Sequence, residues 1–284
     1  MRIAIYGSKR QEAYLTQIQA FLDSLARRAD EVVMHTKLYD YLAGLIPAAL
    51  QCVSTVTSDT DFTADVAVSL GGDGSFLRTA AWVERKGIPI LGVNTGHLGF
   101  LASADISDLP TLADTLASGD YKVKPLSLIE VVAPRVEGWP YALNEVTITK
   151  SETSSIMSIR ADIDNCPLAD YRADGLIIST PTGSTAYNLS VGGPIVQSDA
   201  PVFVLSPIAA HSLSMRPLVV GDNSSMHFDC SSRTPKYRLS IDGHATVLSL
   251  DEPVELRKAP FSVMAVRLPG HTFASTLRDK LSWG

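Results

Sequence analysis

Apolar and polar residues alternate in two different rhythms along the chain, and the first rhythm covers residues 1–120. Short apolar runs typical of strands occupy Arg2–Tyr6, Glu31–Thr36, Ala64–Leu70 and Ile88–Val93. Between them, apolar residues at helical spacing predict helices around Ile18, Phe21, Leu22 and Leu25, over Ser75–Lys86 and over Asp105–Ser118. Because strands that alternate with helices form parallel sheets covered on both faces, we predict an α/β domain over residues 1–120.

The second rhythm is a succession of strand-like segments with little helical periodicity. These strands are predicted at Val123–Val132, Leu143–Thr149, Ile156–Ile163, Gly175–Ser179, Val202–Leu205, Leu218–Val220, Ser225–Cys230, Tyr237–Ile241 and Pro253–Lys258. Turn residues cluster between them, so we predict a β-rich, mostly antiparallel domain over residues 121–260. A strand at Phe261–Arg267 and a helix at Thr272–Leu281 then return to the first rhythm. Residues 261–284 are therefore expected to rejoin the first domain in an α+β fold, with a ligand-binding cleft between the domains.

The composition is typical of a globular protein. The 284 residues are 45% hydrophobic and 19% charged, and a net charge of −6 leaves no surplus of Lys and Arg for general nucleic-acid binding. No run approaches the roughly 18 apolar residues of a membrane span, and the first apolar run is too short for a signal peptide. We therefore expect a cytoplasmic protein with neither nucleic-acid nor membrane partners.

Cysteine and histidine spacing gives no sign of a metal cage. Cys52, Cys166 and Cys230 lie far apart and form no CxxC pair, which fits reduced thiols rather than a disulfide framework. The six histidines show no HExxH or similar spacing. Any metal is therefore expected to arrive with a nucleotide.

The first candidate for chemistry is a glycine turn between the predicted strand Ala64–Leu70 and the next helix. It consists of Gly71, Gly72, Asp73, Gly74 and Ser75. At the carboxyl end of a parallel strand, glycines let the backbone turn sharply and approach a phosphate, and free N–H groups at the helix start point at the anion. The turn is therefore predicted to bind phosphate.

Asp73, inside this turn, has two interpretations. A simple turn acid caps the following helix, and that is the commoner role in a Gly-Asp-Gly turn. A carboxylate beside a phosphate repels it, however, so an acid here makes sense as a general base. In that role Asp73 orients an acceptor hydroxyl and takes its proton while a phosphoryl group is transferred.

Two shorter motifs also follow or precede predicted strands. Residues Asn94–Leu101 form a second glycine loop, in which Phe100 either stacks on an adenine ring or belongs to the core. His97 in this loop is expected to be a surface turn residue. Asn144 and Glu145 precede the strand VTIT, where they suit the vicinal hydroxyls of a ribose, although solvated turn residues are commoner at such positions.

The longest motif is a loop rich in small and hydroxyl-bearing residues. It runs from Arg172 to Ser190 as RADGLIISTPTGSTAYNLS and continues into Gly192-Gly193-Pro194. Its hydroxyls offer donors and acceptors to ribose or phosphate oxygens, and its small residues allow close approach. A helix that begins near Thr185 is expected to present free N–H groups.

The motifs GGDGSFL, NTGHLGFL, NEV and DGLIISTPTGSTAYNLS with GGP together resemble the NAD kinase family, from about residue 64 to about 245. GGDG alone is shared with 6-phosphofructokinases and with diacylglycerol and sphingosine kinases, but the whole series is specific. The resemblance implies a Rossmann-like, 6-phosphofructokinase-like first domain and transfer of the γ-phosphoryl group of ATP to the 2′-hydroxyl of the adenosine ribose of NAD. It also implies Mg²⁺ or another divalent cation with ATP, and a homodimer or homotetramer.

The family's functional residues carry over to matching positions. Asp73 matches the proton acceptor, and Gly71, Gly72, Gly74 and Ser75 match the phosphate loop that receives ATP. Matches to NAD contacts are Asp73, Gly74, Arg78, Phe100, Asn144, Glu145, Arg172, Asp174, Thr182, Thr185, Ala186, Tyr187, Asn188, Leu189 and Ser190. His211 matches a signature interpreted as structural, the turn Ile241–Gly243 resembles one near the ligand, and Ser155 stands where relatives often carry a larger basic residue.

Rival functions are disfavoured by missing motifs. There is no GxxxxGK[ST] P-loop and no protein-kinase HRD or DFG set. A lipid kinase needs an apolar or basic membrane-facing patch, which the sequence lacks, and a dehydrogenase needs GxGxxG after the first strand. A dinucleotide-binding regulator without turnover stays open, although the acid at position 73 argues against it.

Overall fold

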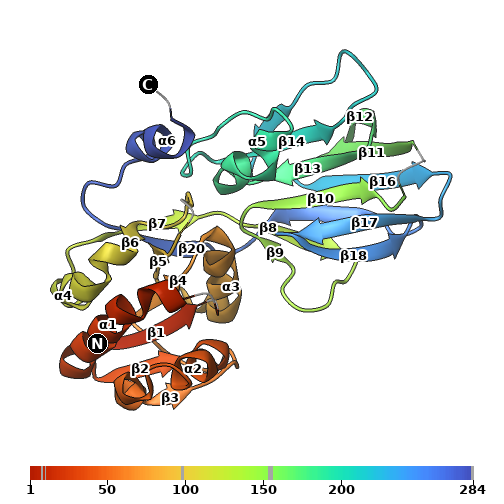
Figure 1. The fold of residues 1–284 in the computed structure, drawn as a ribbon. Coiled ribbons are helices and arrows are strands. Elements are labelled where there is room, and N and C mark those ends of the chain that lie inside the picture. The colour runs from red at the N-terminus through yellow and green to blue at the C-terminus, as the bar shows by residue number, and fades with distance from the viewer. Residues whose placement is uncertain (8, 10, 97–98, 153–155, 283–284) are drawn as a thin grey trace. The chain divides into compact units, whose positions relative to one another are not determined.

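The structure, a computed structural model, describes residues 1–7, 9, 11–96, 99–152 and 156–282. The chain divides into two compact units, one formed by Met1–Pro125 with Val263–Gly284 and the other by Leu126–Ser262 (Figure 1). No helix in the described ranges is both long enough and apolar enough to cross a membrane.

The first unit is built on a sheet with the strand order β3-β2-β1-β4-β5-β20-β7, and β6 pairs with β5. Its strands are β1 (Arg2–Gly7), β2 (Glu31–Met34), β3 (Thr55–Val56), β4 (Val66–Leu70), β5 (Ile90–Asn94), β6 (Ala104–Asp105), β7 (Lys122–Leu126) and β20 (Val263–Arg267). The pairings from β3 through β20 are parallel. Every residue of β4 and β5 is buried, as expected for parallel strands covered on both faces.

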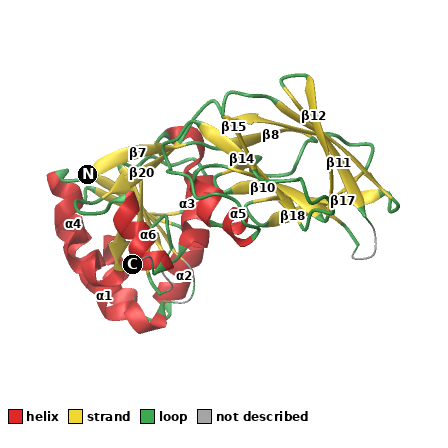
Figure 2. Cartoon of the chain, turned by 90° about the horizontal axis from the view of Figure 1, so that it is seen from above, coloured by secondary structure: helices red, strands yellow, loops and turns green. Residues whose placement is uncertain are grey.

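Helices cover this sheet (Figure 2). They are α1 (Leu15–Arg28), α2 (Thr36–Ala43), α3 (Asp73–Val83) and α4 (Leu109–Ser118), with the short 3₁₀ helices η1 (Glu12–Tyr14), η2 (Pro47–Cys52), η3 (Glu84–Lys86) and η4 (Ile106–Asp108). A last helix, α6 (Phe273–Leu281), follows β20. The apolar stripe predicted from Ile18 to Leu25 is buried in α1. Arg28 of α1 forms an ion pair with Asp114 of α4. The predicted α/β architecture of this part of the chain is confirmed.

The order of the strands reverses at the middle of the sheet. From β1 the chain moves outward to β2 and β3, and it then returns to β4 on the other side of β1. At such a switch point the loops that follow the strands separate and leave a crevice at the carboxyl edge of the sheet. The glycine turn after β4 lies at this point.

The second unit contains two six-stranded sheets, with the orders β15-β14-β13-β10-β17-β18 and β12-β11-β16-β19-β8-β9. Their strands are β8 (Ile129–Ala133), β9 (Tyr141–Ala142), β10 (Glu145–Lys150), β11 (Met157–Ile163), β12 (Cys166–Ala173), β13 (Gly175–Ser179), β14 (Val202–Ile208), β15 (Leu218–Gly221), β16 (Met226–Ser232), β17 (Lys236–Ile241), β18 (His244–Ser249) and β19 (Val254–Lys258). The neighbours pair antiparallel, and residues of both sheets, such as Ile178 and Phe228, share one apolar core. The predicted β-rich architecture is therefore confirmed.

Some predicted elements differ from the structure. The single strand predicted at Val123–Val132 is wrong, because the chain ends β7 at Leu126 and begins β8 in the other unit at Ile129. Thr36, predicted to end a strand, begins α2, since the side chain of His35 caps that helix by accepting a hydrogen bond from Lys37 N. Strands β12 and β18 were not predicted, and most of their residues face outward, including apolar ones such as Leu168 and Val247.

Candidate active site

Asp73 lies in the first turn of α3, directly after β4, and its carboxylate binds the loop that follows β5. Oδ2 accepts a hydrogen bond from the backbone N–H of Phe100 at 2.8 Å, and Oδ1 accepts one from that of Leu101 at 3.0 Å. The N-cap of α3 is Gly72, and no side chain caps this helix. The interpretation of Asp73 as a helix cap is therefore wrong, because its carboxylate instead joins two neighbouring strand-end loops.

The loop approaches Asp73 so closely that residue 99 must be glycine. A Cβ built on Gly99 would lie 2.0 Å from Asp73 Oδ1. The glycine turn is also tied to β5, since Gly71 N donates to Val93 O at 3.0 Å. The carboxylate is thus held from two sides, while each oxygen keeps a lone pair for a further donor.

Arg78 turns back over the start of its own helix. Its Nη2 donates to Ser75 Oγ at 3.3 Å, and its Nη1 would lie 3.5 Å from a Cβ built on Gly74. Arg78 as a residue is exposed to solvent. A cation therefore lies beside the N–H groups of the predicted phosphate turn, where a phosphate oxygen would meet both.

Two further cations near Asp73 were missed by sequence reasoning. Arg267, at the end of β20, donates through Nη1 to Leu101 O at 3.0 Å and to Ser103 Oγ at 3.2 Å. Lys280 lies in α6. Burial lowers the pKa of both side chains, and the nearby charge of Asp73 raises it. Only Arg267 carried a signal in the sequence, as the basic residue that ends the apolar run FSVMAVR.

In the second unit, Asp242 fixes the backbone that carries Asn144 and Glu145. Its carboxylate accepts hydrogen bonds from the N–H groups of Leu143 at 2.8 Å, Asn144 at 2.8 Å and Glu145 at 3.0 Å. Burial raises the pKa of Asp242, and these hydrogen bonds act in the opposite direction. The late turn that resembles one near the family's ligand therefore acts on the Asn-Glu pair.

Glu145 is only 8% exposed, and its Oε2 has no hydrogen-bond partner in the described part of the chain. Burial raises its pKa from 4.5 to about 7, with a further contribution from Asp242, while the N–H of Tyr187 lowers it. Burying a carboxyl group costs free energy unless its oxygens find donors. Glu145 therefore presents an acceptor that lacks a donor.

We expect Glu145 to make stability depend on pH. Because its folded-state pKa lies above the unfolded value, the folded state binds the proton more tightly, and stability falls as pH rises from about 4.5 to about 7. The full loss amounts to at most about 3 kcal/mol. In urea unfolding at pH 5 and pH 8, Glu145→Gln should lose most of this difference, whereas the exposed Glu152→Gln should keep it. Equal pH dependence in the wild type and Glu145→Gln would contradict the assignment.

The loop from Thr180 lies directly on the Asn-Glu pair. Thr180 Oγ1 donates to Leu143 O at 2.5 Å and accepts from Gly183 N at 3.0 Å. A Cβ on Gly183 would lie 2.0 Å from Asn144 O, so this contact requires glycine. The helix expected near Thr185 consists of two short pieces, η5 (Thr182–Thr185) and α5 (Tyr187–Ser190).

The predicted contacts in this loop differ in their access to a ligand. Tyr187 and Ser190 are exposed, while Thr185, Ala186 and Leu189 are half-buried. Thr182 Oγ1 is buried without a hydrogen-bond partner in the described residues.

Asn188 of the same loop is fully buried. Its Nδ2 donates to Ser184 O at 3.0 Å and Pro194 O at 3.1 Å, and its Oδ1 accepts from Ser206 Oγ at 2.6 Å. All its polar atoms are therefore used inside the unit, so the side chain of Asn188 holds the loop and does not reach a ligand.

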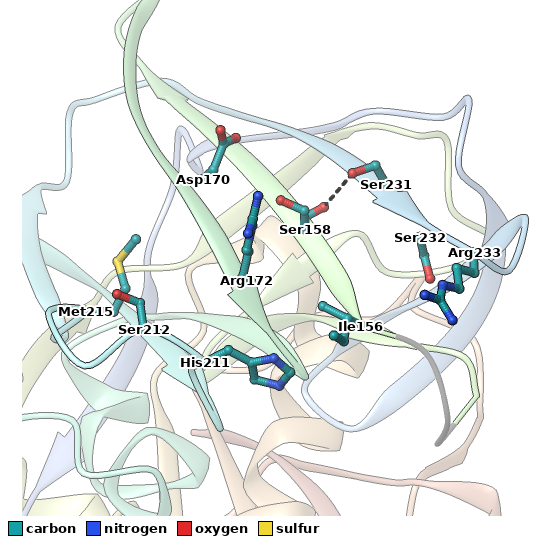
Figure 3. A pocket seen from close by; sticks show the side chains of 10 residues that line it. All are labelled: Ile156, Ser158, Asp170, Arg172, His211, Ser212, Met215, Ser231, Ser232 and Arg233. Carbon is teal, nitrogen blue, oxygen red and sulfur yellow. Dashed lines mark hydrogen bonds between the residues drawn. The ribbon is translucent and has the colours of Figure 1, made fainter.

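Arg172 and Asp174 are only two residues apart but have different surroundings. Asp174 Oδ1 accepts from Lys150 Nζ at 2.6 Å, a partner that sequence reasoning did not find. Arg172 lies on the edge strand β12 and helps to line a pocket of about 760 Å³. Figure 3 shows it between Asp170 and His211, with Arg233 also in the lining. The pocket thus contains two guanidinium groups and an imidazole.

Three positions of interest, His97, Leu98 and Ser155, lie outside the described residues. Within the described ranges, no group of three or more His, Cys, Asp or Glu side chains is arranged to hold a metal ion. Cys52, Cys166 and Cys230 are free thiols.

A glycine turn with a fixed carboxylate, at the switch point of a doubly wound sheet, defines a phosphate-binding α/β protein. The comparisons with known proteins are more specific. Residues 14–121 match the family model of the ATP-NAD kinase N-terminal domain, and residues 143–268 match that of the ATP-NAD kinase C-terminal domain. The chain belongs to the ATP-NAD kinase family, which confirms the resemblance found in the sequence.

Relatives match along the whole chain. The NAD kinase of Porphyromonas gingivalis is 40% identical over 286 residues, which cover 100% of this chain and 98% of that protein. The NAD kinase of Bacteroides fragilis is 36% identical with the same coverage. Among solved structures, yeast NADH kinase in complex with NADH has a TM-score of 0.87 and 21% identity, covering 100% of this chain and 88% of that one. The NAD kinase of Archaeoglobus fulgidus in complex with ATP has a TM-score of 0.76, 23% identity and full coverage of both chains. These two structures establish the shared fold.

Proposed function

We propose that the protein is an NAD kinase that transfers the γ-phosphoryl group of ATP to the 2′-hydroxyl of the adenosine ribose of NAD. The observation that carries the proposal is the carboxylate of Asp73, which is fixed at a phosphate-type glycine turn by the N–H groups of Phe100 and Leu101. A site that only bound phosphate would gain nothing from a carboxylate at position 73.

In the proposed reaction the ribose 2′-oxygen attacks the γ-phosphorus. The bond from this phosphorus to the β–γ bridging oxygen breaks, and ADP leaves with the bonding electron pair. The hydroxyl proton passes to Asp73, whose oxygens each keep a lone pair beside the backbone hydrogen bond. Catalysis of this kind depends mainly on position and charge, which the N–H groups of α3 and the guanidinium of Arg78 supply at the phosphate turn.

We propose that the dinucleotide is bound by Gly74, Arg78, Phe100, Asn144, Glu145, Arg172, Asp174, Thr182, Thr185, Ala186, Tyr187, Leu189 and Ser190. The buried acceptor Glu145 Oε2 supports this assignment, because a ribose hydroxyl would supply its missing donor. The buried hydroxyl of Thr182 gives similar support. ATP binding is assigned mainly to residues 1–120 and 261–284, with its phosphates at Gly71, Gly72, Gly74 and Ser75, and NAD binding mainly to residues 121–260.

The direct test measures NADP formation from NAD and ATP with a coupled dehydrogenase assay, together with NAD binding by calorimetry. Formation of one NADP for each ADP supports the proposal. Binding of NAD without turnover would identify a dinucleotide-binding regulator instead.

The divalent cation is proposed to enter with ATP as part of the substrate, so chelation should stop turnover and spare NAD binding. With EDTA in excess over Mg²⁺, we expect NADP formation to fall at least about tenfold, since the cation neutralises charge on the transferred group. NAD affinity should stay within about threefold. Undiminished turnover under EDTA, or a parallel loss of NAD binding, would argue against this role.

A homodimer or homotetramer and a cytoplasmic location are parts of the same proposal, and light scattering tests the assembly.

A further inference from the structure

Arg267 is a half-buried cation at the carboxyl end of β20, close to the candidate active site. Within the described ranges it forms no ion pair with a carboxylate. Its hydrogen bonds go to the loop after β5, since one nitrogen, Nη1, donates to both Leu101 O and Ser103 Oγ. A half-buried guanidinium without an ion pair is costly, which favours a role for its charge.

The loop that Arg267 binds is the one that holds Asp73. Leu101 accepts from Arg267 through its carbonyl at 3.0 Å and donates through its N–H to Asp73 Oδ1, also at 3.0 Å. Ser103 extends the same connection, because its Oγ donates to Val266 O at 2.6 Å and its N–H donates to Gly92 O at 3.0 Å. The loop is therefore fastened to β20 and β5 on one side and to the carboxylate on the other.

We infer that Arg267 is a positioning residue for Asp73 that fixes the N–H donors of the loop after β5. The inference rests on the proposed function, in which Asp73 is the base. Arg267 also supplies positive charge on this side of the carboxylate, together with Lys280 of α6, and the charge of Asp73 acts on both cations. In this role neither Arg267 nor Lys280 needs to contact the substrate.

A positioning role predicts a loss of turnover without a loss of binding. For Arg267→Gln we expect kcat to fall about 10- to 100-fold, because a carboxylate displaced by a fraction of an ångström to one ångström loses its alignment. The KM values for NAD and ATP should change by less than about threefold. Arg267→Lys should lose less than about fivefold, since a single nitrogen makes both hydrogen bonds and an ammonium group can replace it.

The decisive measurement is a double-mutant cycle with Asp73→Asn. If Arg267 acts through Asp73, the double variant should be no slower than Asp73→Asn alone, within about threefold. The matched control is Arg2→Gln, which removes an arginine that also makes hydrogen bonds, to Thr63 and Asp65, at the amino end of β1 in the same sheet. Its kcat should stay within about twofold of the wild type.

Two results would overturn the inference and leave the proposed function intact. One is a wild-type kcat in Arg267→Gln, and the other is an equal fold-loss of kcat when Arg267→Gln is made in the wild type and in Asp73→Asn. A fully active Asp73→Asn would instead remove the proposed base itself. Thermal unfolding and NAD binding of each variant identify a folding defect. If Arg267→Gln fails to fold, the cycle is run with Arg267→Met, which keeps a long side chain but removes both hydrogen bonds, and an additive loss in that cycle contradicts the inference equally.

Discussion

Replacement of Asp73 by asparagine is expected to lower turnover by about 10²- to 10⁴-fold, the usual range for removal of a positioned base. Asparagine keeps the size of the side chain, but its amide cannot take the proton of the ribose hydroxyl. It also offers only one acceptor oxygen to the N–H groups of Phe100 and Leu101, which aspartate satisfies with two. NAD affinity should remain within about tenfold, because most of the proposed contacts lie elsewhere.

The comparison requires single-turnover rates and NAD binding for Asp73→Asn and for a matched control. Asp65→Asn is suitable, because the Asp65 carboxylate also accepts a backbone hydrogen bond, from Arg2 N at 2.7 Å, in the same unit. The control should keep wild-type turnover within about threefold. An Asp73→Asn variant as fast as the wild type would refute the role of Asp73 as the base.

The part of the site that could be predicted from the sequence lies at strand ends. Glycines directly after a mostly apolar segment such as Val66–Leu70 mark the carboxyl edge of a buried parallel strand, and this pattern located both the glycine turn and Asp73. The residue types in the turn did not reveal that the carboxylate of Asp73 binds the loop after β5. That contact joins residues 27 and 28 positions apart, and local propensity carries no information about such separations.

Residues brought in by the end of the chain were missed for the same reason. Arg267 reaches the site only because β20 pairs in parallel with β5, with Ala265 opposite Ile90. The sequence predicted that residues 261–284 rejoin the first domain, but it did not predict which strand of the sheet they pair with. Lys150 was missed because its partner Asp174 is 24 positions away in the sequence, at the bend between β12 and β13.

Strands β12 and β18, which were not predicted, show a second limit. Both lie in hairpins whose turn residues have positive φ, namely Asp164 at 49° and Asn165 at 63°, and Asp242 at 46° and Gly243 at 84°. Such pairs favour type I′ turns, and Asp-Gly is a strong hairpin signal. The strands after these turns are largely exposed, and the turn residues, rather than the apolar pattern, are the signal that locates them. The second turn also provides Asp242, whose support of Asn144 and Glu145 depends on the hairpin.

Substitution of Gly99 by alanine is the change outside Asp73 with the largest expected effect on turnover. The added Cβ would lie 2.0 Å from Asp73 Oδ1 and 2.6 Å from its Cγ, so the loop or the carboxylate must move by about an ångström. A displacement of that size costs about 10²-fold in rate. The clash of the added Cβ with the carboxylate of Asp73 is the reason for the expected effect.

The measurement is kcat and NAD affinity for Gly99→Ala beside Gly44→Ala, whose added Cβ would meet only Tyr41 O at 3.9 Å. We expect Gly44→Ala to keep full turnover. Gly99→Ala should lose about 10²-fold in kcat while NAD affinity stays within about tenfold, since the clash displaces the proposed base and leaves the proposed binding residues of the second unit in place. Wild-type kcat in Gly99→Ala would mean that catalysis tolerates a displaced Asp73, and the mechanism proposed from its fixed position would then be wrong.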